Sequence, residues 1–126
     1  MFEWPVRVYW EDTDAGGIVF YANYLKFFER SRTEWLRQLG LNQQHLRNET
    51  GGMFVVSHTA VDYLQPARLD DELVISTQLQ QLGRASLHLH QTAKRGDALL
   101  CKGVVVVRWV NSQSMRPARM PNPVLD

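Results

Sequence analysis

The stretch from Glu11 to Arg32, EDTDAGGIVFYANYLKFFERSR, is the part of the chain that most restricts how it can fold. It places Asp12 and Asp14 at the end of a predicted strand, and Gly16–Gly17 then lets the main chain take a tight or left-handed turn. A helix is predicted to follow, with Asn23 as its cap, and free N–H groups at a helix start attract negative charge. The layout therefore predicts a carboxylate facing an anion-stabilising helix end, which is the minimum equipment for attack on a carbonyl group.

The spacing of apolar residues predicts an α+β domain. Trp4 to Glu11 alternates as a half-buried strand does, with Val6, Val8 and Trp10 on one face. From Asn23 to Leu39 the apolar residues recur at intervals of three and four, which predicts one long helix that Gly40 ends. A short helical turn is predicted near 42–48, and four more strands at 54–64, 72–82, 85–94 and 98–110. One long helix with about five strands is typical of the α+β class.

Composition narrows the class of protein. The 126 residues suit one domain covering 1–126, and a net formal charge of +1 does not indicate a nucleic-acid-binding protein, although it allows one phosphate-bearing ligand. Cys101 is the single cysteine, and its apolar neighbours predict a buried strand residue rather than a nucleophile. The sequence has no apolar run of about 18 residues, and Met1 to Trp10 lacks the pattern of a signal peptide. We therefore expect a cytoplasmic protein without a membrane span.

The sequence resembles the acyl-CoA thioesterases of the hotdog fold, specifically the group similar to 4-hydroxybenzoyl-CoA thioesterase and to the bacterial thioesterases associated with the Tol-Pal envelope system. The residues that carry the resemblance are DTDAGGIVFYANYLKFFERSRTEWL, the opening WPVRVYWED, the middle stretch VDYLQPARLDDEL and the valine-rich strand near the end. The resemblance implies an antiparallel sheet of about five strands wrapped around one long helix. It also implies hydrolysis of acyl-CoA to a free acid and coenzyme A. We expect no cofactor and, from the histidine spacing, no metal site.

The resemblance assigns two residues to the chemistry. Asp14 matches the acidic residue that such thioesterases use as nucleophile or general base, whereas Asp12 is expected to shape the loop. The alternative from the residues alone is that both are ordinary turn acids that bind nearby N–H groups. Tyr21 matches the position whose main-chain N–H polarises the thioester carbonyl. Many Tol-Pal-associated members have histidine there, but a thiol with a pKa near ~8.5 leaves with little acid assistance, so we favour a main-chain role.

Further residues are candidates for substrate binding. Glu29 matches a polar pocket residue of the aromatic-substrate relatives, and the alternative is a surface partner for a residue four positions away. Arg84, Ala85 and Ser86, at the opening of a predicted strand, are candidates for contacts to the pantetheine or phosphates of CoA, with a plain hairpin as the alternative. The tail from Asn111, with Pro117, Pro121 and Pro123, is expected to be extended, and Arg116 and Arg119 to be solvated, with phosphate binding as the alternative.

The sequence leaves other activities and partners open. His88 and His90 point to one face of a strand, which favours an exposed or interfacial face over a metal site. Two alternative functions are a hotdog dehydratase, which would pair a histidine with an acid, and a non-catalytic module that binds acyl-CoA or acyl carrier protein. No histidine lies between Met1 and Gly40. A homotetramer built from dimers is expected, since one sheet over one helix leaves an apolar surface and open strand edges.

Overall fold

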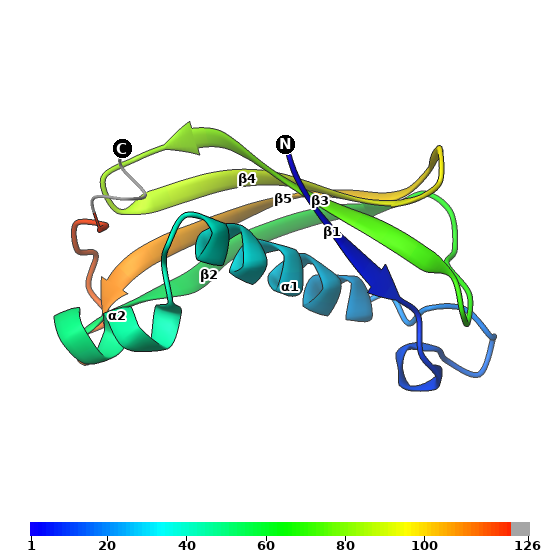
Figure 1. Cartoon of the computed structure of the whole chain (residues 1–126), viewed down its shortest axis with the longest axis horizontal. Helices are drawn as coiled ribbons and strands as arrows, with labels where there is room; N and C mark the ends of the chain where they lie inside the picture. The colour runs from blue at the N-terminus through cyan, green and yellow to red at the C-terminus, as the bar shows by residue number, and fades with distance from the viewer. Residues whose placement is uncertain (122–126) are drawn as a thin grey trace.

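A computed structural model describes residues 1–121, and Figure 1 shows a curved sheet with one long helix lying against its concave face. The strands are β1 (Phe2–Arg7), β2 (Gly52–Tyr63), β3 (Glu72–Leu82), β4 (Ser86–Arg95) and β5 (Ala98–Asn111). They are all antiparallel to their neighbours and lie in the order β1-β3-β4-β5-β2. The edges of the sheet are therefore β1 on one side and β2 on the other.

The long helix, α1 (Asn23–Gln38), begins and ends close to where its sequence predicts. Gly40 has a φ of 86°, and the Leu41 N–H donates to the carbonyl of Leu36, so the chain leaves the helix through a left-handed glycine. A second helix, α2 (Gln43–Thr50), is capped by the side chain of Asn42, which accepts a hydrogen bond from the His45 N–H. The end of α1 and the start of α2 thus each follow a local sequence signal.

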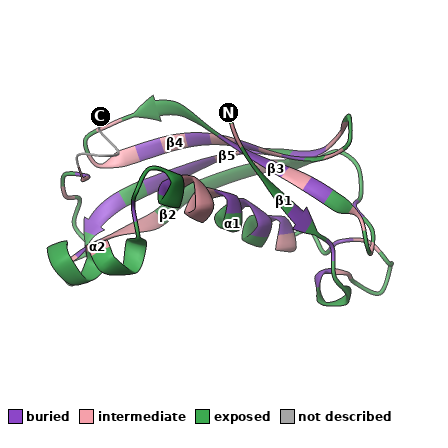
Figure 2. Ribbon diagram, in the orientation of Figure 1, coloured by how far each residue is buried: buried purple, intermediate pink, exposed green. Residues whose placement is uncertain are grey.

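Side chains of α1 and the concave face of the sheet form two apolar clusters. Figure 2 marks buried residues along α1 and along the strands that it faces. The first surrounds the start of α1, where Tyr24, Phe27 and Phe28 are buried against β1, β3 and β5. The second surrounds its end, where Leu36 packs with Trp109 and with residues of β4 and β5. α1 is therefore fixed along its whole length, and its first turn is held in place by the core.

Two local predictions near the start of the chain were wrong. The first strand ends at Arg7 instead of Glu11, because the carboxylate of Asp12 accepts the Tyr9 N–H at 2.8 Å and turns the chain into the short 3-10 helix η1 (Trp10–Asp12). Trp10 is consequently 81% exposed and is no part of the strand face. Asn23 does not cap α1 either: Ala22 is the N-cap residue, without a side-chain bond, and the Asn23 amide donates instead to the carbonyl of Asp12 at 2.8 Å.

Predictions for the second half of the chain agree better with the structure. Cys101 is fully buried on β5, and this burial raises the pKa of its thiol to about 12, which confirms a structural residue. After β5 the segment makes a turn at 112–114 and then runs back along the sheet, where Met120 is buried and its N–H donates to the Arg84 carbonyl. The tail is thus packed as far as Pro121, and Pro123 lies outside the described residues.

Candidate active site

Asp12 is buried, at 4% exposed, and all of its contacts hold the loop that precedes α1. Its Oδ2 accepts the Tyr9 N–H at 2.8 Å. Its carbonyl accepts two more hydrogen bonds, from the Phe20 N–H at 3.0 Å and from the Asn23 side chain at 2.8 Å. This residue therefore joins both ends of the loop to the start of the helix.

Asp14 lies two residues further on and is exposed. Its Oδ1 accepts the Gly16 N–H at 2.8 Å, and the Gly17 N–H donates to its carbonyl at 3.0 Å, with a φ of 77° at Gly17. Its Oδ2 receives no hydrogen bond from residues 1–121. One oxygen therefore holds the turn, as an ordinary turn acid would, while the other is available to a substrate or a water molecule.

The start of α1 offers main-chain donors in the same loop. Within residues 1–121 neither the Tyr21 N–H nor the Ala22 N–H has an acceptor, whereas the next residue, Asn23, donates to the Phe20 carbonyl at 2.8 Å. Unpaired N–H groups at the first turn carry the positive end of the helix dipole. The Tyr21 side chain is 61% exposed and packs against Phe20 and Tyr63 without a hydrogen bond in this part of the chain.

A hollow lined mainly by aromatic and apolar side chains adjoins the helix start, and we refer to it as the aromatic hollow. It has a volume of about 290 Å³ and is lined by Ile18, Val19, Tyr21, Tyr24, Tyr63, Leu64, Gln65 and Pro66. Its walls are fixed to the loop before α1, because the Val19 N–H donates to the Ala67 carbonyl at 2.9 Å and the Ala67 N–H donates to the Tyr24 hydroxyl at 3.2 Å.

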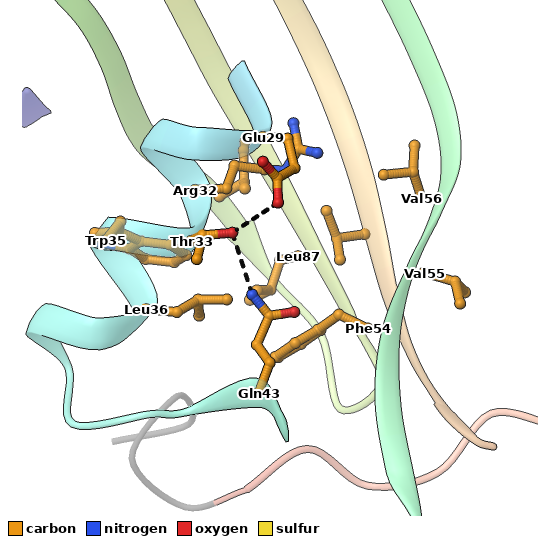
Figure 3. A pocket seen from close by; sticks show the side chains of 12 residues that line it. Glu29, Arg32, Thr33, Trp35, Leu36, Gln43, Phe54, Val55, Val56 and Leu87 are labelled. Carbon is orange, nitrogen blue, oxygen red and sulfur yellow. Dashed lines mark hydrogen bonds between the residues drawn. The ribbon is translucent and has the colours of Figure 1, made fainter. Parts of the chain in front are cut away.

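Glu29 lines a second pocket, of about 230 Å³, between α1 and strand β2 (Figure 3). Leucine and valine side chains of β4 and β5 form its apolar floor. One wall is polar: the Thr33 hydroxyl donates to Glu29 Oε1 at 3.1 Å, and the Gln43 amide donates to that hydroxyl at 3.4 Å. Glu29 therefore has a partner four residues away and also faces a pocket, so the two roles considered for it are compatible.

Arg32 lies beside Glu29 in this wall and was missed by the sequence reasoning. Its guanidinium donates to Gln91 Oε1 at 3.0 Å, and it makes no ion pair within residues 1–121. Burial lowers its pKa below the ordinary value, and the Glu29 carboxylate opposes that shift. Gln91 in turn donates to the Phe28 carbonyl at 2.9 Å and to the Thr77 hydroxyl at 2.8 Å. A glutamine on the inward face of β4 was the available signal for this buried network.

Arg84, Ala85 and Ser86 lie away from Asp14 in the same chain. Arg84 and Ala85 form the turn between β3 and β4, and Ser86 is the first residue of β4, at the end of α1 opposite to its start (Figure 1). The turn is closed by the Gly83 N–H, which donates to the Ser86 carbonyl, and it is joined to β5 through the Ala85 carbonyl. The segment that carries Arg116 and Arg119 packs against it, because the Met120 N–H donates to the Arg84 carbonyl at 2.9 Å. The hairpin is therefore real, and its role in binding stays a prediction.

The comparisons with known proteins bear on this geometry. A model of the Thioesterase-like superfamily matches residues 8–126. The chain belongs to this superfamily. It is 45% identical over 123 residues to the acyl-CoA thioesterase YbgC of Haemophilus influenzae, covering 98% of this chain and 90% of that protein. It is 43% identical over 126 residues to the acyl-CoA thioester hydrolase YbgC of Escherichia coli O157:H7, covering 99% and 93%.

Solved structures of superfamily members support the same conclusion. A probable thioesterase from Bartonella henselae is 35% identical and superimposes with a TM-score of 0.89 over 94% of this chain and 98% of that one. The hotdog fold and the thioesterase activity that the resemblance implied are thereby confirmed for this superfamily member. Within residues 1–121 no helix is long and apolar enough to cross a membrane, and no three metal-binding side chains gather into a site.

Proposed function

We propose that this thioesterase hydrolyses acyl-CoA to a free carboxylic acid and coenzyme A, with Asp14 as nucleophile or general base. The observation that carries the proposal is the combination of one free carboxylate oxygen on Asp14 with unpaired N–H groups at Tyr21 and Ala22 in one short loop. Main-chain donors at a helix start are suited to the oxyanion that forms when a thioester carbonyl is attacked. The relatives from H. influenzae and E. coli, named as acyl-CoA thioesterases, support the substrate class.

Two routes use the same groups. In the first, Asp14 Oδ2 attacks the carbonyl carbon, the C–S bond breaks, the thiolate leaves, and water then hydrolyses the acyl-aspartyl anhydride. In the second, Asp14 takes a proton from a water molecule whose oxygen attacks the carbonyl carbon directly. A single turnover in ¹⁸O-labelled water tests the first route, because label enters the Asp14 carboxylate only when an acyl-aspartyl anhydride forms and water attacks its Asp14 carbonyl carbon.

Glu29 and Arg32 are proposed to contact the far end of the acyl group. Glu29 lies eight residues beyond Tyr21, which is about 12 Å along a helix. The apolar floor of their pocket suits a hydrocarbon or aromatic body, and the polar wall offers one carboxylate acceptor and the guanidinium donors that Gln91 does not use. The acyl group would thus extend from the thioester along α1.

A second copy of the chain is proposed to complete the site. Within residues 1–121 strand β2 pairs only with β5, so its outer edge is open over 12 residues in this part of the chain, and Val56 on it is 50% exposed. The edge at β1 is interrupted by Pro5. The Val8 N–H donates to the Asp71 carbonyl, on the side of β3, and main-chain groups point to alternate sides along a strand. Pro5 therefore lies on the open side, where it has no N–H to donate. Pairing the β2 strands of two copies would cover the open β2 edge of each copy, which favours a dimer through β2.

Such a dimer would bring the proposed CoA contacts to Asp14. Two antiparallel β2 strands run in opposite directions, so the turn at Arg84, Ala85 and Ser86 of the second copy would approach the Asp14 end of this chain. Arg84, Arg108, Arg116 and Arg119 are exposed at that end of the sheet and make no ion pair within residues 1–121, as suits phosphate binding. We propose further that two dimers form a homotetramer, which light scattering at micromolar concentration would refute by giving the mass of a monomer.

Turnover of a panel of acyl-CoA thioesters tests the proposed function as a whole. Release of free thiol from several acyl-CoAs, lost in Asp14→Asn, is the expected result. Binding of acyl-CoA without thiol release would favour the non-catalytic module, and loss of water from a hydroxyacyl thioester would favour the dehydratase. We also propose a cytoplasmic location for the protein, and its single, buried thiol fits a reducing compartment. Acyl carrier protein stays a further possible donor of the acyl group.

A further inference from the structure

An ion pair closes the connection between β2 and β3. The Arg95 guanidinium donates to Asp71 Oδ2 at 2.8 Å and, from the same nitrogen, to the Pro66 carbonyl at 3.3 Å. Asp71 Oδ2 also accepts the Arg68 N–H at 2.9 Å. Burial alone would raise the pKa of Asp71, but the Arg68 N–H and the Arg95 guanidinium hold it below its ordinary value, so the pair is charged at neutral pH. The pair therefore ties the end of β4 to both ends of the connection.

The connection lies directly against the loop that carries Asp14. Ile18 of that loop forms a β-bridge with Arg68. Next to it, the Val19 N–H donates to the Ala67 carbonyl at 2.9 Å. The Ile18 carbonyl in turn accepts the Asp14 N–H at 2.9 Å. Successive contacts thus run from the ion pair, through the connection and then through Ile18, to the main chain of Asp14.

The part of the connection that lines the aromatic hollow has anchors of its own. The N–H groups of residues 64 and 65 donate to the Leu100 carbonyl, and the Ala67 N–H donates to the Tyr24 hydroxyl. None of these bonds involves the ion pair. Loss of the ion pair should therefore loosen residues 68–71, which meet the Asp14 loop, more than the wall of the hollow.

We propose that Asp71 and Arg95 are positioning residues for the reaction, which hold Asp14 in place through the main chain of the connection. The proposal rests on the proposed function, because it takes Asp14 to act on the thioester carbonyl. Neither Asp71 nor Arg95 lines the aromatic hollow or the Glu29 pocket. Attack depends on the placement of the carboxylate, and a misplacement of about 1 Å can cost ~10²-fold in rate. Loss of the pair should therefore lower kcat and leave substrate binding nearly unchanged.

Steady-state hydrolysis of acetyl-CoA by Arg95→Met, Asp71→Asn and the double variant tests the proposal. Methionine keeps most of the arginine stem and removes both donors, so we expect kcat to fall about tenfold and KM to stay within about threefold. The fall is partial because main-chain bonds join residues 70–71 to Val8 in every variant. The double variant should lose no more than Arg95→Met, because the pair acts as one unit. Arg95 uses a single nitrogen for both acceptors, so Arg95→Lys should recover most of the lost kcat.

Arg7→Gln is the matched control. The Arg7 guanidinium forms an ion pair with Glu72 at 3.0 Å and donates to the Asp70 carbonyl, so it contacts the same connection. The side chains of that pair are 51% and 61% exposed, against 38% and 22% for Arg95 and Asp71. Because exposed ion pairs contribute little, we expect Arg7→Gln to keep kcat within about twofold.

Any of four results would overturn the proposal. A folded Arg95→Met protein with unchanged kcat would show that the pair does not act on the reaction. A rise in KM as large as the fall in kcat would move its effect to substrate binding. Additive losses in the double variant would separate the two residues, and an equal loss in Arg7→Gln would make the effect a general property of the connection. Asp71→Asn, which keeps an acceptor for the Arg68 N–H, carries the same test if Arg95→Met does not fold. Failure of the proposed chemistry is seen separately, as normal kcat in Asp14→Asn.

Discussion

The buried and the exposed side of the loop before α1 each hold one aspartate, and the two have opposite surroundings. Asp12 is 4% exposed, and its carboxylate and carbonyl together accept three hydrogen bonds from the loop and the helix start. Asp14 is exposed, and within residues 1–121 its side chain accepts a hydrogen bond only from the Gly16 N–H. Each carboxylate accepts one main-chain N–H, so burial is what separates the two: Asp12 is enclosed by the loop that it stabilises, whereas Asp14 is exposed and can reach a ligand.

This contrast between Asp12 and Asp14 separates stability from chemistry within three residues of sequence. The buried side fixes where the helix begins, because Asn23 binds the Asp12 carbonyl, whereas the exposed side carries Asp14 in a turn closed by the Gly16 N–H. Each aspartate should therefore respond to substitution in a different measurement. If both affected stability and turnover in proportion, the division would be wrong.

The largest expected effect is on turnover in Asp14→Asn. The amide keeps the size of the side chain and can still accept the Gly16 N–H, but it serves neither as nucleophile nor as base. We expect kcat to fall at least about 100-fold, the lower range for loss of a positioned base. Thiol release from acyl-CoA measures the loss, and thermal unfolding measures the stability.

Little change in melting temperature should accompany that loss, since only an exposed turn is altered. Unchanged turnover would remove Asp14 from the chemistry. Parallel loss of turnover and of folded protein would instead make Asp14 a structural turn acid like Asp12, and the contrast between the two would disappear.

Asp12→Ala should show the reverse behaviour. The substitution leaves the Tyr9 N–H without its acceptor in a partly buried position, which costs about 1–3 kcal/mol in the free energy of unfolding. Urea denaturation measures that loss. Turnover of the fraction that remains folded should fall less than in Asp14→Asn, because the carboxylate of Asp14 is still present. A fall in turnover as large as that of Asp14→Asn, without loss of stability, would contradict the assignment.

How far the sequence could predict these features depends on whether the cause is local. The left-handed exit at Gly40 and the Asx-like turn at Asp14 and Gly16 arise from neighbouring residues and were visible in the sequence. Asn23 was predicted wrongly as a cap because its amide binds Asp12, eleven residues earlier, and no local pattern shows such a contact. The bond from Arg32 to Gln91 spans 59 residues and was missed for the same reason.

Glu29→Gln sharpens the contrast further along α1, with a smaller expected effect. Glu29 is proposed to contact only the far end of the acyl group, so acetyl-CoA should be hydrolysed almost as before. For acyl groups long enough to reach the pocket, kcat/KM should fall about tenfold, the lower range for one hydrogen bond to a charged group. A uniform change across chain lengths would indicate that Glu29 acts on the loop instead of on the substrate. The measurement is a chain-length series of kcat/KM values.

Tyr21→Phe should have the smallest effect, with turnover within about threefold of the unchanged protein. The substitution removes a hydroxyl that binds nothing within residues 1–121, while the main-chain N–H stays in place with its oxyanion contribution of roughly 10²–10³. The thiolate leaving group needs little help from a phenol, since the thiol pKa is near ~8.5. A loss beyond about 100-fold without unfolding would give the phenol a chemical role. In that case the Tyr21 phenol would act as a general acid at the helix start, and the main-chain donors alone would not account for catalysis.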